Sequence, residues 1–161
     1  MLLASLGPTS GAYQAVLVLH ILAVIVGFGA LFINAVYAAL ARRAGGAAQL
    51  AISVASERVV SMVALWFIYA VPILGFALIG MSNKVYKFSQ AWVSVAFALY
   101  IVILVVLLGA VRPAHKHLNE LLAAENPDHG SITAIEKRVA AASGVNHLLV
   151  LVVIYLMVIK P

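Results

Sequence analysis

The fold is decided by LVLHILAVIVGFGALFINAVYAALARR, residues 17–43. This stretch forms most of an apolar segment that runs from about Tyr13 to Leu40 without a formal charge and is ended by Arg42 and Arg43. As a helix rising about 1.5 Å per residue, it can cross a hydrocarbon core of about 30 Å with tilt to spare. It is much longer than the apolar region of a signal peptide, and no Lys or Arg precedes it. We therefore expect a retained membrane-spanning helix.

Three further apolar segments follow, and the four predicted spans are residues 13–40, 59–81, 91–111 and 139–159. Each is close to the ~20 residues that a spanning helix needs. The chain is 65% hydrophobic and 9% charged, whereas soluble domains are about 25% charged. This composition excludes an ordinary water-soluble domain and a nucleic-acid-binding module. The sequence predicts an all-α, polytopic integral membrane protein: a single domain, residues 1–161, forming an up-down bundle of four transmembrane helices in the lipid bilayer.

The basic residues predict how the bundle is oriented. The connections 41–58 and 112–138 carry seven Lys and Arg residues, against three on the opposite side: Arg42, Arg43, Arg58, Arg112, Lys116, Lys137 and Arg138, against Lys84, Lys87 and Lys160. By the positive-inside rule, both connections are cytoplasmic loops and both termini lie outside. We expect a multi-pass protein of a cell membrane, the bacterial inner membrane.

Two local signals lie in the second basic connection. Pro113 is suited to a first helical turn and predicts a short surface helix after it. Ser131 or Thr133 is expected to cap the last helix, because Thr133 and Glu136 have capping-box spacing.

Polar side chains within the apolar spans are the candidates for function, because they cost free energy in lipid unless they face the bundle interior. His20, Gly27 and Asn34 follow at seven-residue steps and therefore share one helix face. His147 has Gly144 three residues earlier on its own face. These five residues define a candidate face for haem b, in a slot floored by Gly27 and Gly144. Either His20 alone or His20 with His147 would then ligate the iron.

Other interpretations of the same residues stay open. The histidines and Asn34 can simply hydrogen-bond across helices, for about 0.6 kcal/mol on average, while the glycines allow close packing. A different ligand or ion is a third interpretation. No Asp, Glu, Lys or Arg lies deep in a span, which argues against a proton-coupled transporter; a polar pore through Asn34, Tyr69, Tyr100 and Asn146 would favour one.

Two classes of metal site are disfavoured. The absence of cysteine excludes thiolate sites and covalent c-type haem. His115, His117 and His129 are interpreted as solvated loop histidines rather than as a cytoplasmic metal site.

The motif in residues 17–43 also carries a family resemblance. Its Leu-His-Ile start, its glycines about seven residues on and its basic stop resemble the DUF2269 family of small predicted bacterial membrane proteins. It is more distantly similar to the CopD-like and HemJ-like four-helix group. Similarity to HemJ-like proteins implies a protoporphyrinogen oxidoreductase that holds haem through His20; similarity to CopD-like proteins implies copper uptake.

The chain departs from both of these distant patterns. Val26-Gly27-Phe28-Gly29 stands where HemJ-like proteins have a tryptophan before the glycines, and four methionines are few for a copper path. The leading hypothesis is a non-enzymatic or accessory membrane protein that holds haem or a similar flat ligand. The oxidoreductase and a small transporter are the alternatives, and association as a homo-oligomer or within a larger membrane complex stays open.

Overall fold

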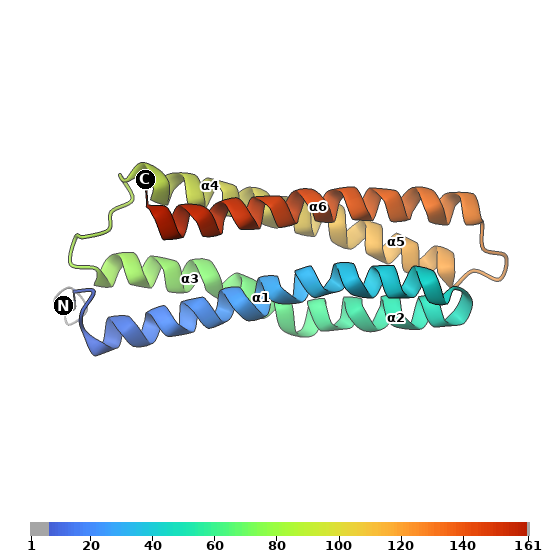
Figure 1. Cartoon of the computed structure of the whole chain (residues 1–161), viewed down its shortest axis with the longest axis horizontal. Helices are drawn as coiled ribbons and strands as arrows, with labels where there is room; N and C mark the ends of the chain where they lie inside the picture. Colours follow the sequence, from blue (N-terminus) through green and yellow to red (C-terminus); the bar gives the residue numbers. More distant parts are fainter. Residues whose placement is uncertain (1–6, 161) are drawn as a thin grey trace.

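The computed structural model describes residues 7–160. Every regular element in that range is helical: α1 (Gly11–Ala44), α2 (Gly46–Val59), α3 (Leu65–Met81), α4 (Ala91–Val106), α5 (Arg112–Leu122) and α6 (His129–Ile159), with π-helical turns at Val60–Ala64 and Leu107–Val111. The π-helical turns join α2 to α3 and α4 to α5 without a break. The chain therefore forms four long apolar helices, each able to cross a membrane (Figure 1), which confirms the predicted all-α membrane bundle.

The four long helices run up and down along one axis (Figure 1). One end carries the chain ends and the connection 82–90, and we name it the terminal end. The other carries the turn at Gly45 and the connection 123–128, and we name it the basic end. α1 packs along α3 and α2, while α6 packs along α4 and α5. Gly45 and Gly46 have φ values of 66° and 50°, a conformation that glycine adopts without steric cost, and so the chain reverses tightly between α1 and α2.

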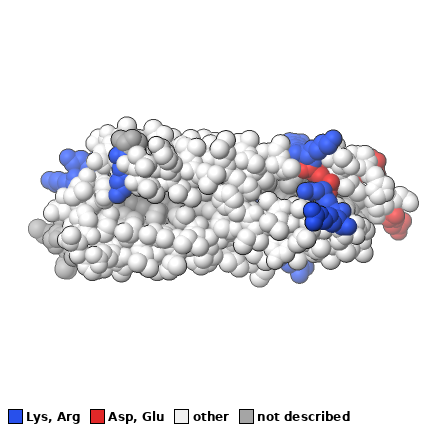
Figure 2. All heavy atoms as spheres, viewed as in Figure 1, with Lys and Arg blue, Asp and Glu red and all other residues white. Residues whose placement is uncertain are grey.

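The helices extend well beyond the predicted spans. α1 has 34 residues and is therefore about 50 Å long, against a hydrocarbon core of about 30 Å. The connections 41–58 and 112–138 are largely helical, formed by α2, α5 and the start of α6. Figure 2 shows a pale middle section with basic side chains toward both ends, and acidic side chains only near the basic end. The bundle thus has an apolar section of membrane thickness and a charged helical extension at the basic end.

The expected short surface helix after Pro113 is instead α5, which continues the third long helix. It packs through Ala114 and Leu118 against Ile132, Ile135 and Val139 of α6. This apolar stripe at helical spacing holds α5 against the bundle, while Lys116 and Glu120 are exposed.

The cap of the last helix also differs from the prediction. Asp128 is the N-cap, and its carboxylate accepts hydrogen bonds from the amides of Gly130 at 3.0 Å and Ser131 at 3.1 Å. The hydroxyl of Thr133 donates to the carbonyl of His129 at 2.9 Å, so Thr133 lies inside the helix and does not cap it. The carboxylate of Asp128 is a strong N-cap that comes earlier in the chain, and the helix therefore begins there.

Large apolar side chains cover the outside of the bundle. Ile25, Trp66 and Val105 are 60%, 73% and 64% exposed, which a soluble monomer rarely tolerates over a continuous surface. In a bilayer these side chains contact lipid. The interior core, in contrast, is formed around fully buried Ile68 and Ile103.

One interior hydrogen bond compensates for a proline. Pro72 lies inside α3 and has no amide hydrogen, so the carbonyl of Ile68 loses its helical donor. The buried Tyr100 hydroxyl of α4 donates to that carbonyl. The bond satisfies a polar group that lipid could not satisfy and fixes α4 against α3 at this level.

Candidate functional site

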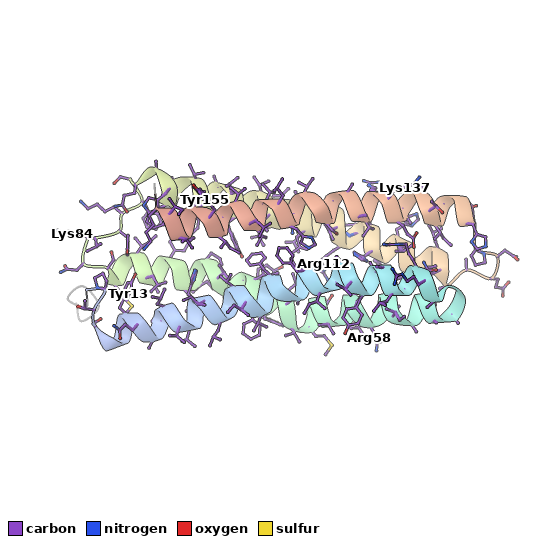
Figure 3. All side chains as sticks on the ribbon, viewed as in Figure 1. Tyr13, Arg58, Lys84, Arg112, Lys137 and Tyr155 are labelled. Atoms are coloured by element: carbon purple, nitrogen blue, oxygen red, sulfur yellow. The ribbon has the colours of Figure 1, made fainter. Side chains whose placement is uncertain are left out.

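Two cavities lie between the helices, one above the other along the bundle. The apolar cavity, of 390 Å³, lies toward the terminal end and is lined by α1, α3, α4 and α6. The polar cavity, of 260 Å³, lies toward the basic end and is lined by α1, α2, α5, α6 and the adjacent π-helical turn. Each of the expected histidines belongs to a different cavity. The labelled side chains of Figure 3 mark the levels of the bundle, with Tyr13 and Tyr155 toward the terminal end and Arg58 and Lys137 toward the basic end.

His20 lines the apolar cavity. Its Nδ1 is buried and makes no hydrogen bond within residues 7–160, although the Val71 backbone of α3 lies close by. Across from the ring is Gly75, where a Cβ would come within 3.5 Å of His20 Cε1. The proline-containing part of α3 thus forms a close wall behind the imidazole.

The rest of this cavity is hydrocarbon and aromatic surface. Phe28, Phe97 and Met157 contribute to it, and no charged side chain is among the described residues that line it. The phenyl ring of Phe28 meets the ring of Tyr100 edge to face, with centroids 6.2 Å apart. Because the Tyr100 hydroxyl is bound to the Ile68 carbonyl, His20 is the polar group available to a ligand here.

His147 lies elsewhere and is held firmly. Its Nε2 donates a hydrogen bond to the carbonyl of Leu31 at 3.1 Å, and its ring stacks on Phe32 with centroids 4.4 Å apart and planes 17° apart. This residue lines the polar cavity together with Asn146, which is 2% exposed. The contact partners on α1 fix the level of His147 along the bundle.

That level separates the two expected ligands. Leu31 follows His20 by eleven residues on the same helix, which corresponds to about 16 Å along the axis. No single iron reaches both rings, so the structure does not bring His20 and His147 together as a ligand pair.

The two glycines of the expected slot also have different surroundings. A Cβ on Gly27 would lie 2.9 Å from Ile68 Cγ1 and 3.0 Å from Ile68 N. Gly27 therefore marks a close approach of α1 to α3 and is not a cavity floor. Gly144 has no atom within 4 Å of its Cβ position and lines the polar cavity, as does Asn34.

The residues of the expected polar pore do not gather either. Tyr69 is 39% exposed on the outer surface, and Tyr100 is bound to Ile68. Of the four residues of the expected pore, Asn34 and Asn146 line the polar cavity and the two tyrosines do not. The part of the chain that the structure describes also contains no group of three His, Cys, Asp or Glu side chains placed to hold a metal ion.

His115 is the residue that the sequence interpretation missed. It is 8% exposed, lines the polar cavity and is not a solvated loop histidine. The signal was present, because Ala114, His115 and Leu118 have the spacing of one buried helix face. The helix after Pro113 was expected to lie on the surface, whereas α5 packs against α6 and buries His115.

Polar side chains of α2, α5 and α6 tie the basic end together around this cavity. Ser53 Oγ donates to Asn119 Oδ1 at 2.5 Å, and Asn119 Nδ2 donates to Glu57 Oε2 at 2.7 Å. Gln49 Nε2 donates to Glu136 Oε1 at 2.8 Å. These bonds join neighbouring helices, so hydrogen bonds hold the wall of the polar cavity together.

Comparison with known proteins gives one result. The model of a family described as predicted integral membrane protein, DUF2269, matches residues 14–161. No curated protein and no solved structure matches the chain.

Proposed function

We propose that this chain, which belongs to the DUF2269 family of predicted integral membrane proteins, is a ligand-holding protein of the bilayer whose apolar cavity takes haem b through His20. The proposal concerns binding and not a particular reaction. It rests mainly on one observation, the imidazole of His20 in the wall of an otherwise hydrocarbon cavity.

The setting of His20 supports this proposal. A metal-binding imidazole commonly directs one ring nitrogen at a carbonyl or carboxylate and the other at the metal. Here Nδ1 is buried against α3 near the Val71 backbone. Gly75 lets the ring lie close to α3.

The size of the cavity is that of a small-molecule site. Its volume of 390 Å³ falls in the range of about 300–1,000 Å³ typical of small-molecule sites. Phe28 and Phe97 would cover the macrocycle and exclude water, while haem would supply a redox-active iron. Since no described cation lines the cavity, the two haem carboxylates have to lie outside it.

The absence of a second histidine among the described lining residues bears on the oxidoreductase alternative. His20 would be the one histidine that holds haem here, and the group would then supply the redox chemistry that an oxidoreductase needs. Growth of a strain lacking protoporphyrinogen oxidase, restored by the wild-type chain but not by His20→Ala, would support this alternative.

The first test is a haem titration of the purified protein in detergent. We expect a Soret band with saturable binding for the wild type, loss of that binding in His20→Ala, and its retention in His147→Ala, because His147 lies at a different level. Circular dichroism of each variant checks that the helices persist. A wild-type protein that stays colourless after haem addition would overturn the proposal.

We also propose that the basic end faces the cytoplasm, since seven of the ten Lys and Arg residues belong to it. Reporter fusions at residues 86 and 125 test this orientation. We expect a periplasmic signal from the first and a cytoplasmic signal from the second; the reverse pair of signals would contradict it.

A further inference from the structure

The polar cavity contains polar groups that the fold leaves without partners. Asn146 Oδ1 and His115 Nδ1 are buried and make no hydrogen bond within the described chain, in side chains that are only 2% and 8% exposed. Leaving such a group buried and unpaired costs stability. Both residues line the same cavity, although one comes from α6 and the other from α5.

His147 is the third polar residue of this cavity, and its hydrogen bond determines which ring nitrogen carries the proton. The Leu31 carbonyl can only accept, so His147 Nε2 must carry the proton. In the neutral ring, Nδ1 is then an acceptor. The cavity therefore offers an imidazole nitrogen and an amide oxygen as acceptors, and a complementary ligand must bring hydrogen-bond donors.

Charge in the cavity argues for an uncharged ligand. Its described lining contains one cation, Arg42, and one anion, Glu136, both near the basic end. Glu136 already accepts from Gln49. The deeper lining around Asn146 is neutral, so a ligand with net charge there would have no counter-ion and would bear a large desolvation cost.

The cavity reaches the surface in two places. One is at Arg42, near the basic end, and the other lies between α1 and α6, where the exposed residues Ala35 and Gly144 line it. On the remaining sides α2 and α5 enclose it, with Ser53 and Asn119 joined across the wall.

We infer that the polar cavity is a binding site for a small, uncharged, hydrogen-bonding solute, one that carries amide or hydroxyl donors. Asn146 and His147 would bind its donors, and His115 would complete the site. This inference does not depend on any ligand of the apolar cavity.

The natural absence of cysteine makes the test direct. We would place single cysteines by Ser143→Cys in the polar cavity, Ala134→Cys on the exposed surface of α6 and Leu148→Cys on its lipid face. Each purified variant is alkylated with iodoacetamide and, separately, with iodoacetate. The two reagents have nearly the same size but differ in charge.

At Ser143→Cys we expect ready reaction with iodoacetamide. The ratio of the iodoacetamide rate to the iodoacetate rate should be larger at Ser143→Cys than at Ala134→Cys by about tenfold or more. This factor corresponds to at least 1.4 kcal/mol of discrimination against the charge. An excess of acetamide should protect Ser143→Cys but not Ala134→Cys. Adding Asn146→Leu to Ser143→Cys should abolish the protection, while the α-helical spectrum is kept.

Three outcomes would overturn the inference. Ser143→Cys as unreactive as Leu148→Cys would mean a closed, dry cavity. The same ratio of the two alkylation rates at Ser143→Cys and Ala134→Cys would mean that the cavity does not exclude charge. Reaction without protection by acetamide would mean that the cavity holds water only.

Discussion

Gly27→Ala is expected to destabilise the bundle more than any other single-methyl change in the apolar section. The new Cβ would lie 2.9 Å from Ile68 Cγ1 and 3.0 Å from the Ile68 amide nitrogen. Ile68 is fully buried, and its amide belongs to the backbone of α3, so neither atom has room to move. Forcing α1 away from α3 should cost about 1–3 kcal/mol, and Gly27→Leu should cost more.

Gly29→Ala is the matched control, because nothing lies within 4 Å of its Cβ position two residues further along the same helix. The gain in helix propensity should make that change neutral or slightly stabilising. Thermal unfolding in detergent micelles measures both variants. Equal midpoints for Gly27→Ala and the wild type would show that the helices do not touch at this level.

Tyr100→Phe is the second change with a large expected effect. It removes the donor that satisfies the Ile68 carbonyl, a group that Pro72 leaves without its helical partner. An unpaired carbonyl in the membrane interior should cost about 1–3 kcal/mol. The ring of Phe would keep the edge-to-face contact with Phe28, so the loss reports the hydrogen bond.

A double-mutant cycle tests whether Tyr100 acts through its hydrogen bond to the Ile68 carbonyl. Pro72→Ala restores an amide at position 72 that can donate to the Ile68 carbonyl, and Tyr100→Phe should therefore cost little in the Pro72→Ala background. We expect a coupling free energy of at least about 0.6 kcal/mol, the average for hydrogen bonds measured between membrane helices. Additive free energies of unfolding would show that Tyr100 acts through packing alone.

The architecture was predictable because it depends on residue type and segment length. Four long apolar segments separated by basic residues leave few alternatives to a helical membrane bundle, since a spanning chain must satisfy its backbone internally. The extent of the helices was less predictable. Residues 46–59 are polar enough to resemble a loop, but they form α2 and pack against α1 and α5. Residues 112–122 were expected to include a short surface helix, and their packing against α6 makes α5 part of the bundle.

The candidate site was predictable only one helix at a time. The seven-residue steps place His20, Gly27 and Asn34 on one face, but that face contacts different neighbours along its length. His20 lies at the apolar cavity, Gly27 against Ile68, and Asn34 at the polar cavity. Which helices meet, and at what level, depends on interhelical contacts such as His147 with Leu31, and sequence periodicity carries no information about those.

The central claim is that His20 and His147 serve separate sites. The spin state of ferric haem bound to the purified protein, measured by electron paramagnetic resonance in the wild type and in His147→Ala, tests it most directly. A single histidine ligand predicts a high-spin signal that is unchanged by His147→Ala. A low-spin, bis-histidine signal that disappears in His147→Ala would contradict the claim, because it would require both rings on one iron.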